Sequence, residues 1–472
     1  MPAERAVESS LLSIIGEVFT LYGFEDVQHR SVEPVPVLLS KGETSKEVYV
    51  LSRLQDAYES EDGVINLRER LSSKKQLGLH FDLTVPFARY VLDAAHLLHF
   101  PFRRSSIGKV WRGERPQAGR FREFVQADVD IVAEQANGIS SQEALGVFND
   151  VEVVKVILQA LQSLEVSSAK TSEGARPEST HPNGRQDGRQ FNMPPVKIHI
   201  NNRKLLQGCF EALGVQSFEK VLQTLDKLPK LGVDAVSNEL INLGESADVV
   251  EKCLQLAQIQ GDKSFLDKSA LLQGLTSQNA LAKEGFDELI YVLEELNTPQ
   301  CIANLSITRG LDYYTGSVFE TFIDGFESYG SVASGGRYDN LASTLGAQTK
   351  VNYPGVGMSI GVSRLLAIGF ENDFFKLDGY SPVEVMVAVN SAETRPSSNQ
   401  VADALRNAGI SAMVSPNHAK FGKQIDFAYK RGIVHIVFID DDNYRLKNVF
   451  TGQQSDFSSA TELAGALMRK SL

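Results

Sequence analysis

The chain has 472 residues, 42% of them hydrophobic and 22% charged, and its formal net charge is -12. This composition is ordinary for a globular protein with several domains, and the excess of negative charge argues against a protein that coats nucleic acid without specificity. No apolar run approaches the roughly 20 residues of a membrane helix, and no export signal stands at the N-terminus, so we expect a cytoplasmic protein.

The first predicted element is an amphipathic helix over residues 4–22, because apolar residues recur there at helical spacing. The following segment, GFEDVQHRSVEPVP, is predicted to form a turn and a strand that ends near Pro34. A helix followed by a strand has many uses, so this pattern alone indicates no function.

Residues 77–91 are predicted to form a strand and then a helix, because apolar and polar residues alternate up to Val85 and Pro86 suits a first helical turn. Asp82 and Thr84 then lie at the tip of the strand. Their oxygens suit an ammonium group, which has several N–H donors, and they suit the cap of the following helix equally well. The sequence leaves both interpretations open.

Residues 106–132 are predicted to form two strands joined by a basic loop, RPQAG, in which proline and glycine favour a turn. Apolar residues of the second strand alternate, as on a face that packs on a core: Val125, Ala127, Val129 and Ile131. The opposite face carries polar, charged and aromatic side chains: Arg122, Phe124, Gln126, Asp128 and Asp130. Such a face is costly to bury unless polar groups lie against it.

The incoming strand of this hairpin adds Arg112 and Glu114 on one face. Guanidinium groups suit phosphate oxygens and a phenylalanine ring suits a purine, so the hairpin predicts a nucleotide site. The alternative is an exposed hairpin whose charges pair with one another. The sequence contains no G-x-x-x-x-G-K-[ST] loop, no G-x-G-x-x-G after a strand and no H-E-x-x-H, so it offers no other nucleotide or metal motif.

A helix is predicted over residues 141–164, and the Ser-, Gly- and Pro-rich residues 166–195 read as a flexible loop. A short strand and a helix follow, and residues 220–296 have the leucine-rich periodicity of a helical region. Cys209, Cys253 and Cys301 are far apart in sequence, which indicates neither a disulfide framework nor a zinc site, so we expect them to pack in the core.

Residues 307–322, ITRGLDYYTGSVFETF, combine a fixed cation with two tyrosines that could wall an imidazole ring or could equally be core residues of a hairpin. Gly335 and Gly336 let the backbone approach a ligand. In the segment YPGVGMSIGVSRLL, alternate residues are predicted to enter a core before Arg364 opens a helix.

The last domain, residues 381–472, alternates strands and helices, which predicts a mixed or parallel sheet flanked by helices. It carries ten Lys and Arg against nine Asp and Glu, so it is nearly neutral while the rest of the chain holds almost all the negative charge. Four cations lie close together and suit RNA phosphates, although a solvated helix face is the commoner meaning of such a run: Lys420, Lys423, Lys430 and Arg431.

Several of these stretches resemble one family. WRGERPQAGRFREFVQADVDIV resembles motif 2 of class II aminoacyl-tRNA synthetases, GFEDVQHRSVEPVP resembles motif 1 and YPGVGMSIGVSRLL motif 3. DLTVPFARY and RGLDYYTG resemble the amino-acid-binding strand and the signature of histidyl-tRNA synthetases in particular. FGKQIDFAYKRG resembles the anticodon-binding domain shared by the histidyl, glycyl, prolyl and threonyl enzymes.

The resemblance implies a role for named residues. Histidine would be bound by Asp82, Thr84, Gln126, Asp130, Arg309, Tyr313, Tyr314 and Tyr338. ATP would be bound by Arg112, Glu114, Arg120, Phe124 and Arg364. Arg309 and Arg112 would take part in catalysis. Gln117 and Arg122 would contact the acceptor end of the tRNA. The four cations of the last domain would contact the anticodon. Magnesium would come with ATP, since no motif of the chain predicts a metal site.

The expected fold is α+β: a catalytic core on an antiparallel sheet in residues 1–165 and 303–372, the loop 166–195, a helical insertion in 196–302 and an α/β anticodon-binding domain in 381–472. The expected function is ATP-dependent activation of L-histidine to histidyl adenylate and transfer to tRNA(His), releasing AMP and diphosphate, by a homodimer that pairs through motif 1.

Two other functions are weighed against it. A regulatory paralogue that serves ATP phosphoribosyltransferase in histidine biosynthesis generally lacks the anticodon domain and the RGLDYYTG signature, and both are here. A sensor of histidine or RNA without catalysis would be expected to lose motif arginines, whereas Arg112, Arg309 and Arg364 are in place.

Overall fold

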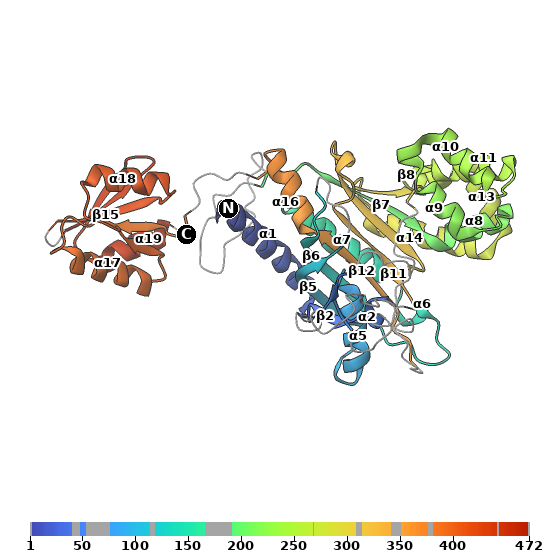
Figure 1. Cartoon of the computed structure of the whole chain (residues 1–472), viewed down its shortest axis with the longest axis horizontal. Helices are drawn as coiled ribbons and strands as arrows, with labels where there is room; N and C mark the ends of the chain where they lie inside the picture. The colour runs from blue at the N-terminus through green and yellow to red at the C-terminus, as the bar shows by residue number, and fades with distance from the viewer. Residues whose placement is uncertain are drawn as a thin grey trace, which may run out of the picture. The chain divides into compact units, whose positions relative to one another are not determined.

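The computed structural model describes residues 2–39, 48–52, 76–113, 119–165, 191–267, 269–307, 314–340, 351–375, 381–440 and 443–470. The chain divides into two compact units (Figure 1): residues 12–165 with 193–372, and residues 1–11 and 166–192 with 373–472. The predicted loop over 166–195 lies, up to residue 190, outside the described residues. Within these ranges, no helix is both long and apolar enough to span a membrane.

The N-terminal elements confirm the predicted helix and strand. Helix α1 (Pro2–Leu21) buries its apolar face, including Leu11, Ile15 and Phe19. Strands β1 (Glu25–Asp26) and β2 (Val32–Pro34) follow, and the second ends at the proline, as expected. A short helix α2 (Val35–Leu38) comes next.

The strand predicted over residues 77–85 is wrong in length. Strand β4 (Leu77–Leu79) has three residues, and helix α5 (Thr84–Ala94) begins two residues before Pro86. The reason is local: the Asp82 carboxylate accepts a hydrogen bond from Val85 N at 3.0 Å, which starts the helix early. Strand β4 pairs with β2 and with β3 (Val50–Leu51) in a separate sheet of three strands.

The large unit is built on one nine-stranded sheet in the order β1-β5-β6-β12-β11-β10-β7-β9-β8. Its strands after β1 are β5 (Phe102–Trp111), β6 (Glu123–Val132), β7 (Val196–Asn202), β8 (Gln260–Gly261), β9 (Cys301–Asn304), β10 (Ser317–Ile323), β11 (Ala333–Tyr338) and β12 (Gly355–Gly361). Most neighbours are antiparallel; β1 with β5 and β7 with β9 are parallel. This confirms the α+β core on an antiparallel-rich sheet.

Strands β5 and β6 form the predicted hairpin, in antiparallel register from Phe102 opposite Val132 to Trp111 opposite Glu123. Both faces of β6 are buried. Ala127, Val129 and Ile131 enter the core on one face, and Gln126, Asp128 and Asp130 are at most 8% exposed on the other. The interpretation of an exposed, self-paired hairpin is therefore wrong.

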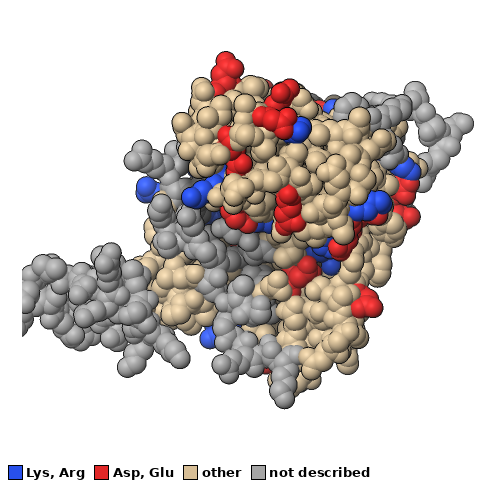
Figure 2. Space-filling view, turned by 90° about the vertical axis from the view of Figure 1, so that its right-hand side faces the viewer, with Lys and Arg blue, Asp and Glu red and all other residues tan. Residues whose placement is uncertain are grey.

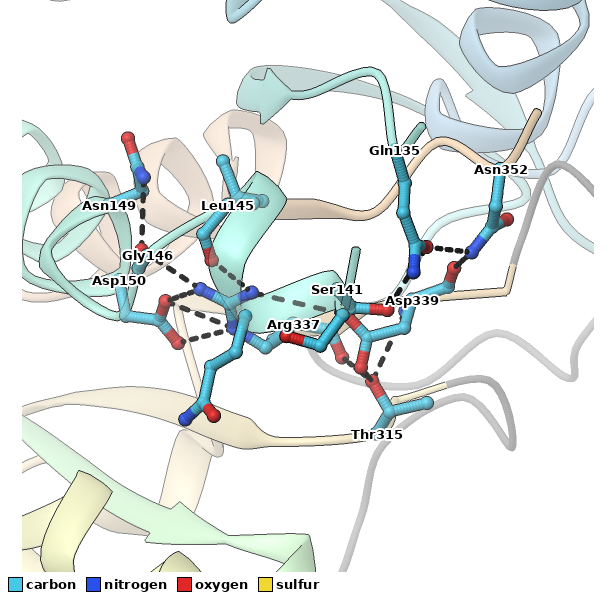
Figure 3. Close-up of polar contacts among 12 residues, drawn as sticks. Gln135, Ser141, Leu145, Gly146, Asn149, Asp150, Thr315, Arg337, Asp339 and Asn352 are labelled. Atoms are coloured by element: carbon cyan, nitrogen blue, oxygen red, sulfur yellow. Dashed lines mark hydrogen bonds and ion pairs between the residues drawn. The ribbon is translucent and has the colours of Figure 1, made fainter. Parts of the chain in front are cut away.

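Helices α6 (Ser141–Ala144), α7 (Phe148–Gln162) and α16 (Val362–Glu371) belong to the same unit, and α7 and α16 pack on the sheet. The helix predicted over 141–164 is therefore broken into α6 and α7. Figure 3 shows the contacts at the break. The buried Arg337 guanidinium donates hydrogen bonds to the carbonyl oxygens of Leu145 and Gly146, at 2.8 and 3.2 Å. These two carbonyls, which lie between α6 and α7, are therefore hydrogen-bonded to a side chain from β11.

The same guanidinium pairs with Asp150 at the start of α7 (Figure 3). Arg337 Nη2 lies 2.5 Å from Asp150 Oδ2, and the two side chains are 3% and 0% exposed. This ion pair ties β11 to α7, from the strand position next to Tyr338.

The region between β7 and β9 is helical, as predicted. Apart from the two-residue strand β8, it consists of α8 (Arg203–Leu213), α9 (Phe218–Leu225), α10 (Leu228–Asn242), α11 (Ala247–Ala257), α12 (Lys263–Asp267), α13 (Ala270–Gln278) and α14 (Ala280–Leu296). On the face that Figure 2 shows, acidic and basic side chains are interspersed among uncharged ones. Cys209, Cys253 and Cys301 are buried and unpaired, which confirms their expected place in the core.

The C-terminal domain has a mixed five-stranded sheet in the order β14-β13-β15-β16-β17. Its elements are β13 (Val385–Val387), α17 (Arg395–Asn407), β14 (Ala412–Val414), α18 (Phe421–Lys430), β15 (His435–Asp440), β16 (Asn443–Asn448), β17 (Gln454–Phe457) and α19 (Ala460–Lys470). The alternating order and the mixed sheet confirm the prediction up to β15. The hairpin β16–β17 was not predicted, because its strands are mostly polar.

Candidate active site

Two adjoining pockets lie on the polar face of the central sheet. The larger has an empty volume of about 600 Å³ and is lined by Arg112, Gly119, Arg120, Phe121, Phe124, Gln126, Ser331, Val332, Ala333, Ser334, Ser359, Gly361 and Arg364. The smaller, of about 230 Å³, is lined by Thr84, Asp128, Asp130, Tyr314, Ser334, Gly335, Tyr338, Gly357, Met358 and Ser359. Ser334 and Ser359 line both, so the pockets meet there.

The larger pocket gathers the cationic side chains predicted to bind a nucleotide. Arg112 is held at its Nε by Phe81 O, at 3.1 Å, and its guanidinium lies 5.2 Å from the centre of the Phe124 ring. Arg364, at the start of α16, donates to Gly119 O at 3.2 Å and to Ser331 O at 2.6 Å. With Arg120, three arginines and two aromatic rings, Phe121 and Phe124, line a single cleft, which suits a polyanion attached to a flat ring.

The smaller pocket is lined by polar side chains whose orientation is fixed by a hydrogen bond and an ion pair between buried residues. Tyr338 Oη donates to Asp130 Oδ1 at 2.8 Å, and the buried Arg104 places its Nη1 3.2 Å from Asp130 Oδ2. Burial, above all, and the neighbouring Asp130 raise the pKa of Tyr338 well above its usual value, so its hydroxyl stays a donor. Gly357 leaves the space that the Asp130 carboxyl occupies, because a Cβ there would lie 2.2 Å from Oδ1.

A hydrogen-bonded chain crosses the junction of the two pockets. Gln126 Nε2 donates to Ser359 Oγ at 2.7 Å, and Ser359 Oγ in turn donates to Asp128 Oδ1. Burial raises the pKa of Asp128 to about 7, with the adjacent Asp130 and Asp82 adding to the shift and Arg104 opposing it. Asp128 and Ser359 were not among the predicted site residues.

The signal for Asp128 was present in the sequence. It lies two residues from both Gln126 and Asp130, and side chains two apart in a strand share a face. Ser359 could not be found in this way, because its place opposite Asp128 depends on the register of β12 with β6.

Of the two residues at the predicted strand tip, Thr84 lines the smaller pocket, and Asp82 is buried and accepts a hydrogen bond from Val85 N in the first turn of α5. The N-cap residue of α5 is Leu83, which makes no side-chain hydrogen bond, so Asp82 acts on this turn from one residue earlier. Its carboxylate has other oxygen lone pairs, so a role in ligand binding stays a prediction.

Several predicted residues fall outside the described residues: Glu114, Gln117, Arg309 and Tyr313. Arg122 is exposed just before β6, where its backbone oxygen accepts from Arg112 N, and it does not line either pocket. In the C-terminal domain, Lys420, Lys423, Lys430 and Arg431 are exposed at α18 and its two ends. Lys430 pairs with Asp426 on the same helix, at 2.7 Å.

Across the described ranges, no three His, Cys, Asp or Glu side chains lie close enough to hold a metal ion. Among the described residues, the lining of the larger pocket includes arginines, serines and an amide but no carboxylate, and Glu114, which is predicted to bind ATP, lies outside them.

Chemically, the two pockets suit different partners. The arginine-lined pocket favours a phosphate-rich molecule, and the pocket with carboxyls and tyrosines favours a small molecule with N–H donors. Because they meet at Ser334 and Ser359, the two bound molecules would touch each other at the junction.

Comparison with known proteins agrees with this geometry. Residues 188–365 match the family model described as histidyl-tRNA synthetase, and residues 384–461 match the anticodon binding domain. A histidine–tRNA ligase of Bifidobacterium animalis subsp. lactis is 41% identical over 96% of this chain and 92% of its own length, and that of Cutibacterium acnes is 42% identical with the same coverage.

The crystal structure of histidyl-tRNA synthetase from Nostoc sp. PCC 7120 superposes with a TM-score of 0.79 at 28% identity, covering 100% of this chain and 97% of that one. A structure described as an ATP phosphoribosyltransferase regulatory subunit/histidyl-tRNA synthetase, from Bacillus halodurans C, gives 0.62 at 16% identity, covering 89% of this chain and 92% of that one. That second likeness shows the fold alone.

Proposed function

Because the chain belongs to the histidyl-tRNA synthetase family, we propose that its two pockets carry out the two-substrate chemistry of a histidine–tRNA ligase. The protein activates L-histidine with ATP to histidyl adenylate and transfers the histidyl group to tRNA, releasing AMP and diphosphate. The regulatory paralogue is not favoured, since the relatives that match along nearly the whole chain are ligases.

The observation that best supports this assignment is that the two pockets adjoin and share two lining residues, Ser334 and Ser359. We assign ATP to the larger pocket and histidine to the smaller, so that the histidine carboxylate meets the α-phosphate at Ser334 and Ser359. The carboxylate oxygen bonds to the α-phosphorus while the bond to diphosphate breaks. Catalysis then depends on holding the reactants in line and on cations around the phosphate, with no protein base required.

Within this proposal, Arg112, Arg120 and Arg364 bind the phosphates and Phe124 the adenine ring, while Thr84, Gln126, Asp130, Tyr314 and Tyr338 surround histidine. Arg309 and Tyr313 are assigned to histidine, and Glu114 to ATP, on the sequence alone. Magnesium would arrive on the phosphates of ATP, where it neutralises negative charge.

We also propose a cytoplasmic homodimer. The small sheet β2-β4-β3, to which motif 1 contributes β2, exposes three apolar side chains: Val32, Leu51 and Leu77, at 36%, 38% and 44%. Apolar side chains gathered on one exposed sheet suit burial against a second copy.

The ligase activity is tested by histidine-dependent exchange between ATP and diphosphate, followed by charging of tRNA(His). Exchange that requires histidine and no other amino acid is the expected result. Exchange without charging would indicate an enzyme that makes an adenylate for another acceptor. Absence of both, in protein shown to be folded, would overturn the assignment.

The division of labour between the domains gives a further prediction. A chain that ends at Gly379 should still form histidyl adenylate, because both pockets lie in the large unit, but it should charge tRNA far more slowly. The C-terminal domain, to which we assign the anticodon, has its own buried core around Val385, Leu405 and Leu463. Equal loss of exchange and charging, in a truncated protein that is folded and dimeric, would contradict the division.

A further inference from the structure

His80 is a buried histidine between β4 and α5, and it lines neither pocket. Its ring is held from two sides, because Nδ1 lies 3.1 Å from Arg30 O and Nε2 lies 2.7 Å from Lys109 O. The residue is 2% exposed, and the centre of its ring lies 5.4 Å from that of the Trp111 ring. A polar side chain held so closely in the core is a candidate for fixing the parts of the chain that it joins.

Both partners of the His80 ring are backbone carbonyl oxygens, which can only accept hydrogen bonds. Each contact is therefore a hydrogen bond only if the ring nitrogen that faces it carries a hydrogen. A ring protonated on both nitrogens satisfies the two carbonyls at once, with donors that point in different directions. An amide side chain has its donors on a single nitrogen, so asparagine or glutamine can replace one of the contacts but not both.

The two carbonyls belong to different parts of the large unit. Arg30 precedes β2 of the small sheet, whereas Lys109 lies near the end of β5. Backbone hydrogen bonds join the same segments, since His80 N donates to Ser31 O at 3.1 Å and Trp111 N donates to His80 O at 3.0 Å. The His80 side chain therefore doubles the contacts that fix the end of β5 against the segment before β2.

The residue that follows His80 reaches the larger pocket. Phe81 O accepts a hydrogen bond from Arg112 Nε at 3.1 Å, and the Phe81 side chain is buried in the core. A bond at Nε fixes the plane of a guanidinium, so a shift of the Phe81 carbonyl moves the terminal nitrogens of Arg112 with it. The short segment that His80 anchors thus sets the orientation of an arginine that lines the larger pocket.

We infer that His80 is a positioning residue for adenylate formation, because its two hydrogen bonds set the place of Phe81 O and so the orientation of the Arg112 guanidinium. The inference rests on the proposed function, which assigns the phosphates of ATP to the larger pocket. His80 itself contacts neither substrate. Its effect on the reaction passes through Arg112, whose cation has to be in place before negative charge grows on the phosphate.

Single-turnover formation of histidyl adenylate by the full chain, at saturating ATP and histidine, measures this effect. His80→Phe keeps a ring beside Trp111 and removes both donors. We expect it to lower the rate about 10- to 100-fold, the cost of a small misplacement of a group that acts on the reactants. Affinity for histidine alone, measured by calorimetry, should change much less, because Arg112 lies in the other pocket.

Glutamine and asparagine separate the two contacts. The amide nitrogen of glutamine lies about as far along the side chain as Nε2, so His80→Gln can keep the bond to Lys109 O, and asparagine can likewise keep the bond to Arg30 O. Because β5 leads directly into Arg112, His80→Gln should be faster than His80→Asn, and both should be faster than His80→Phe. These smaller side chains also cover the case in which phenylalanine does not fit. If His80→Asn were as fast as His80→Gln, or faster, the bond to β5 would not be the one that matters and the inference would be wrong.

A double-mutant cycle separates positioning from a general loss of stability. In the Arg112→Ala background, His80→Phe should lower the remaining rate by no more than about 2-fold, since the group through which it acts is gone. If the two losses multiplied instead, His80 would act independently of Arg112, which contradicts the inference.

His199→Phe is the matched control. His199 is a half-buried histidine on β7 of the central sheet, with Asn304 Nδ2 2.9 Å from its Nδ1 and the Phe322 ring beside it, and it lines neither pocket. This variant should form the adenylate at the wild-type rate. Wild type that forms no adenylate would count against the ligase function itself, whereas active wild type matched in rate by His80→Phe would overturn the role of His80 alone.

Discussion

Replacing Arg112 by alanine is expected to lower the rate of histidyl adenylate formation by at least about 10² to 10³. The side chain lines the larger pocket, and Phe81 O and the Phe124 ring fix its orientation before any ligand binds. Its terminal nitrogens have no hydrogen-bond partner within the ranges that the structure describes, so they are available to phosphate oxygens. Such a preorganised cation stabilises the charge that grows on the phosphate in the transition state more than it stabilises bound ATP.

Single-turnover formation of the adenylate, at saturating histidine and ATP, separates this effect from binding. Arg112→Lys should recover the rate only in part, because an ammonium keeps the charge but not the planar pair of donors. Arg103→Ala is the matched control: this arginine lies on β5, which ends immediately before Arg112, but it pairs with Glu152, outside both pockets. A near-normal rate for Arg112→Ala would assign the charge stabilisation to Arg364, Arg309 and magnesium.

The second large effect is expected on stability. Asp150→Asn should lower the free energy of unfolding of the large unit by about 3 to 5 kcal/mol, because it leaves the buried Arg337 guanidinium without its counter-ion. Both side chains are almost fully buried, and Arg337 also holds the carbonyls at the break between α6 and α7. The single tryptophan, Trp111, lies on β5 of this unit, so its fluorescence during urea unfolding reports on the affected part.

Two controls make this result specific. The double variant Asp150→Leu with Arg337→Met should recover part of the loss, since no unpaired buried charge remains. Asp248→Asn breaks an exposed pair with Lys252 and should change stability by no more than about 1 kcal/mol. If Asp150→Asn were equally mild, the Arg337 guanidinium would be shown to reach other partners when its carboxylate is removed.

The sequence predicted those parts of the fold in which local pattern and burial agree. The alternation in β6, the apolar face of α1 and the core positions of β12 are all of this kind, since each depends on residues close together in the chain. The same holds for the larger pocket, because Arg112, Arg120 and Phe124 belong to one hairpin.

The sequence prediction was wrong, or made no statement, where a structural feature depends on contacts that local sequence pattern does not express. The break between α6 and α7 depends on Arg337, nearly two hundred residues later, as its contact with Leu145 O spans 192 positions. Ser359 reaches Asp128 only through strand register. Strand β4 is short because one carboxylate captures a backbone N–H, which residue periodicity does not express.

The alternation of β11 has a consequence for engineering the amino-acid specificity of this enzyme. Neighbouring residues of a strand point to opposite faces, so Tyr338 lines the smaller pocket, to which we assign histidine, while Arg337 anchors the strand to α7. A library that varies Tyr338 together with Tyr314 and Thr84 reshapes the pocket for histidine analogues without touching that anchor. If the proposed assignment of the pocket holds, a residue that selects the amino acid and a residue that holds the scaffold lie one position apart on the same strand.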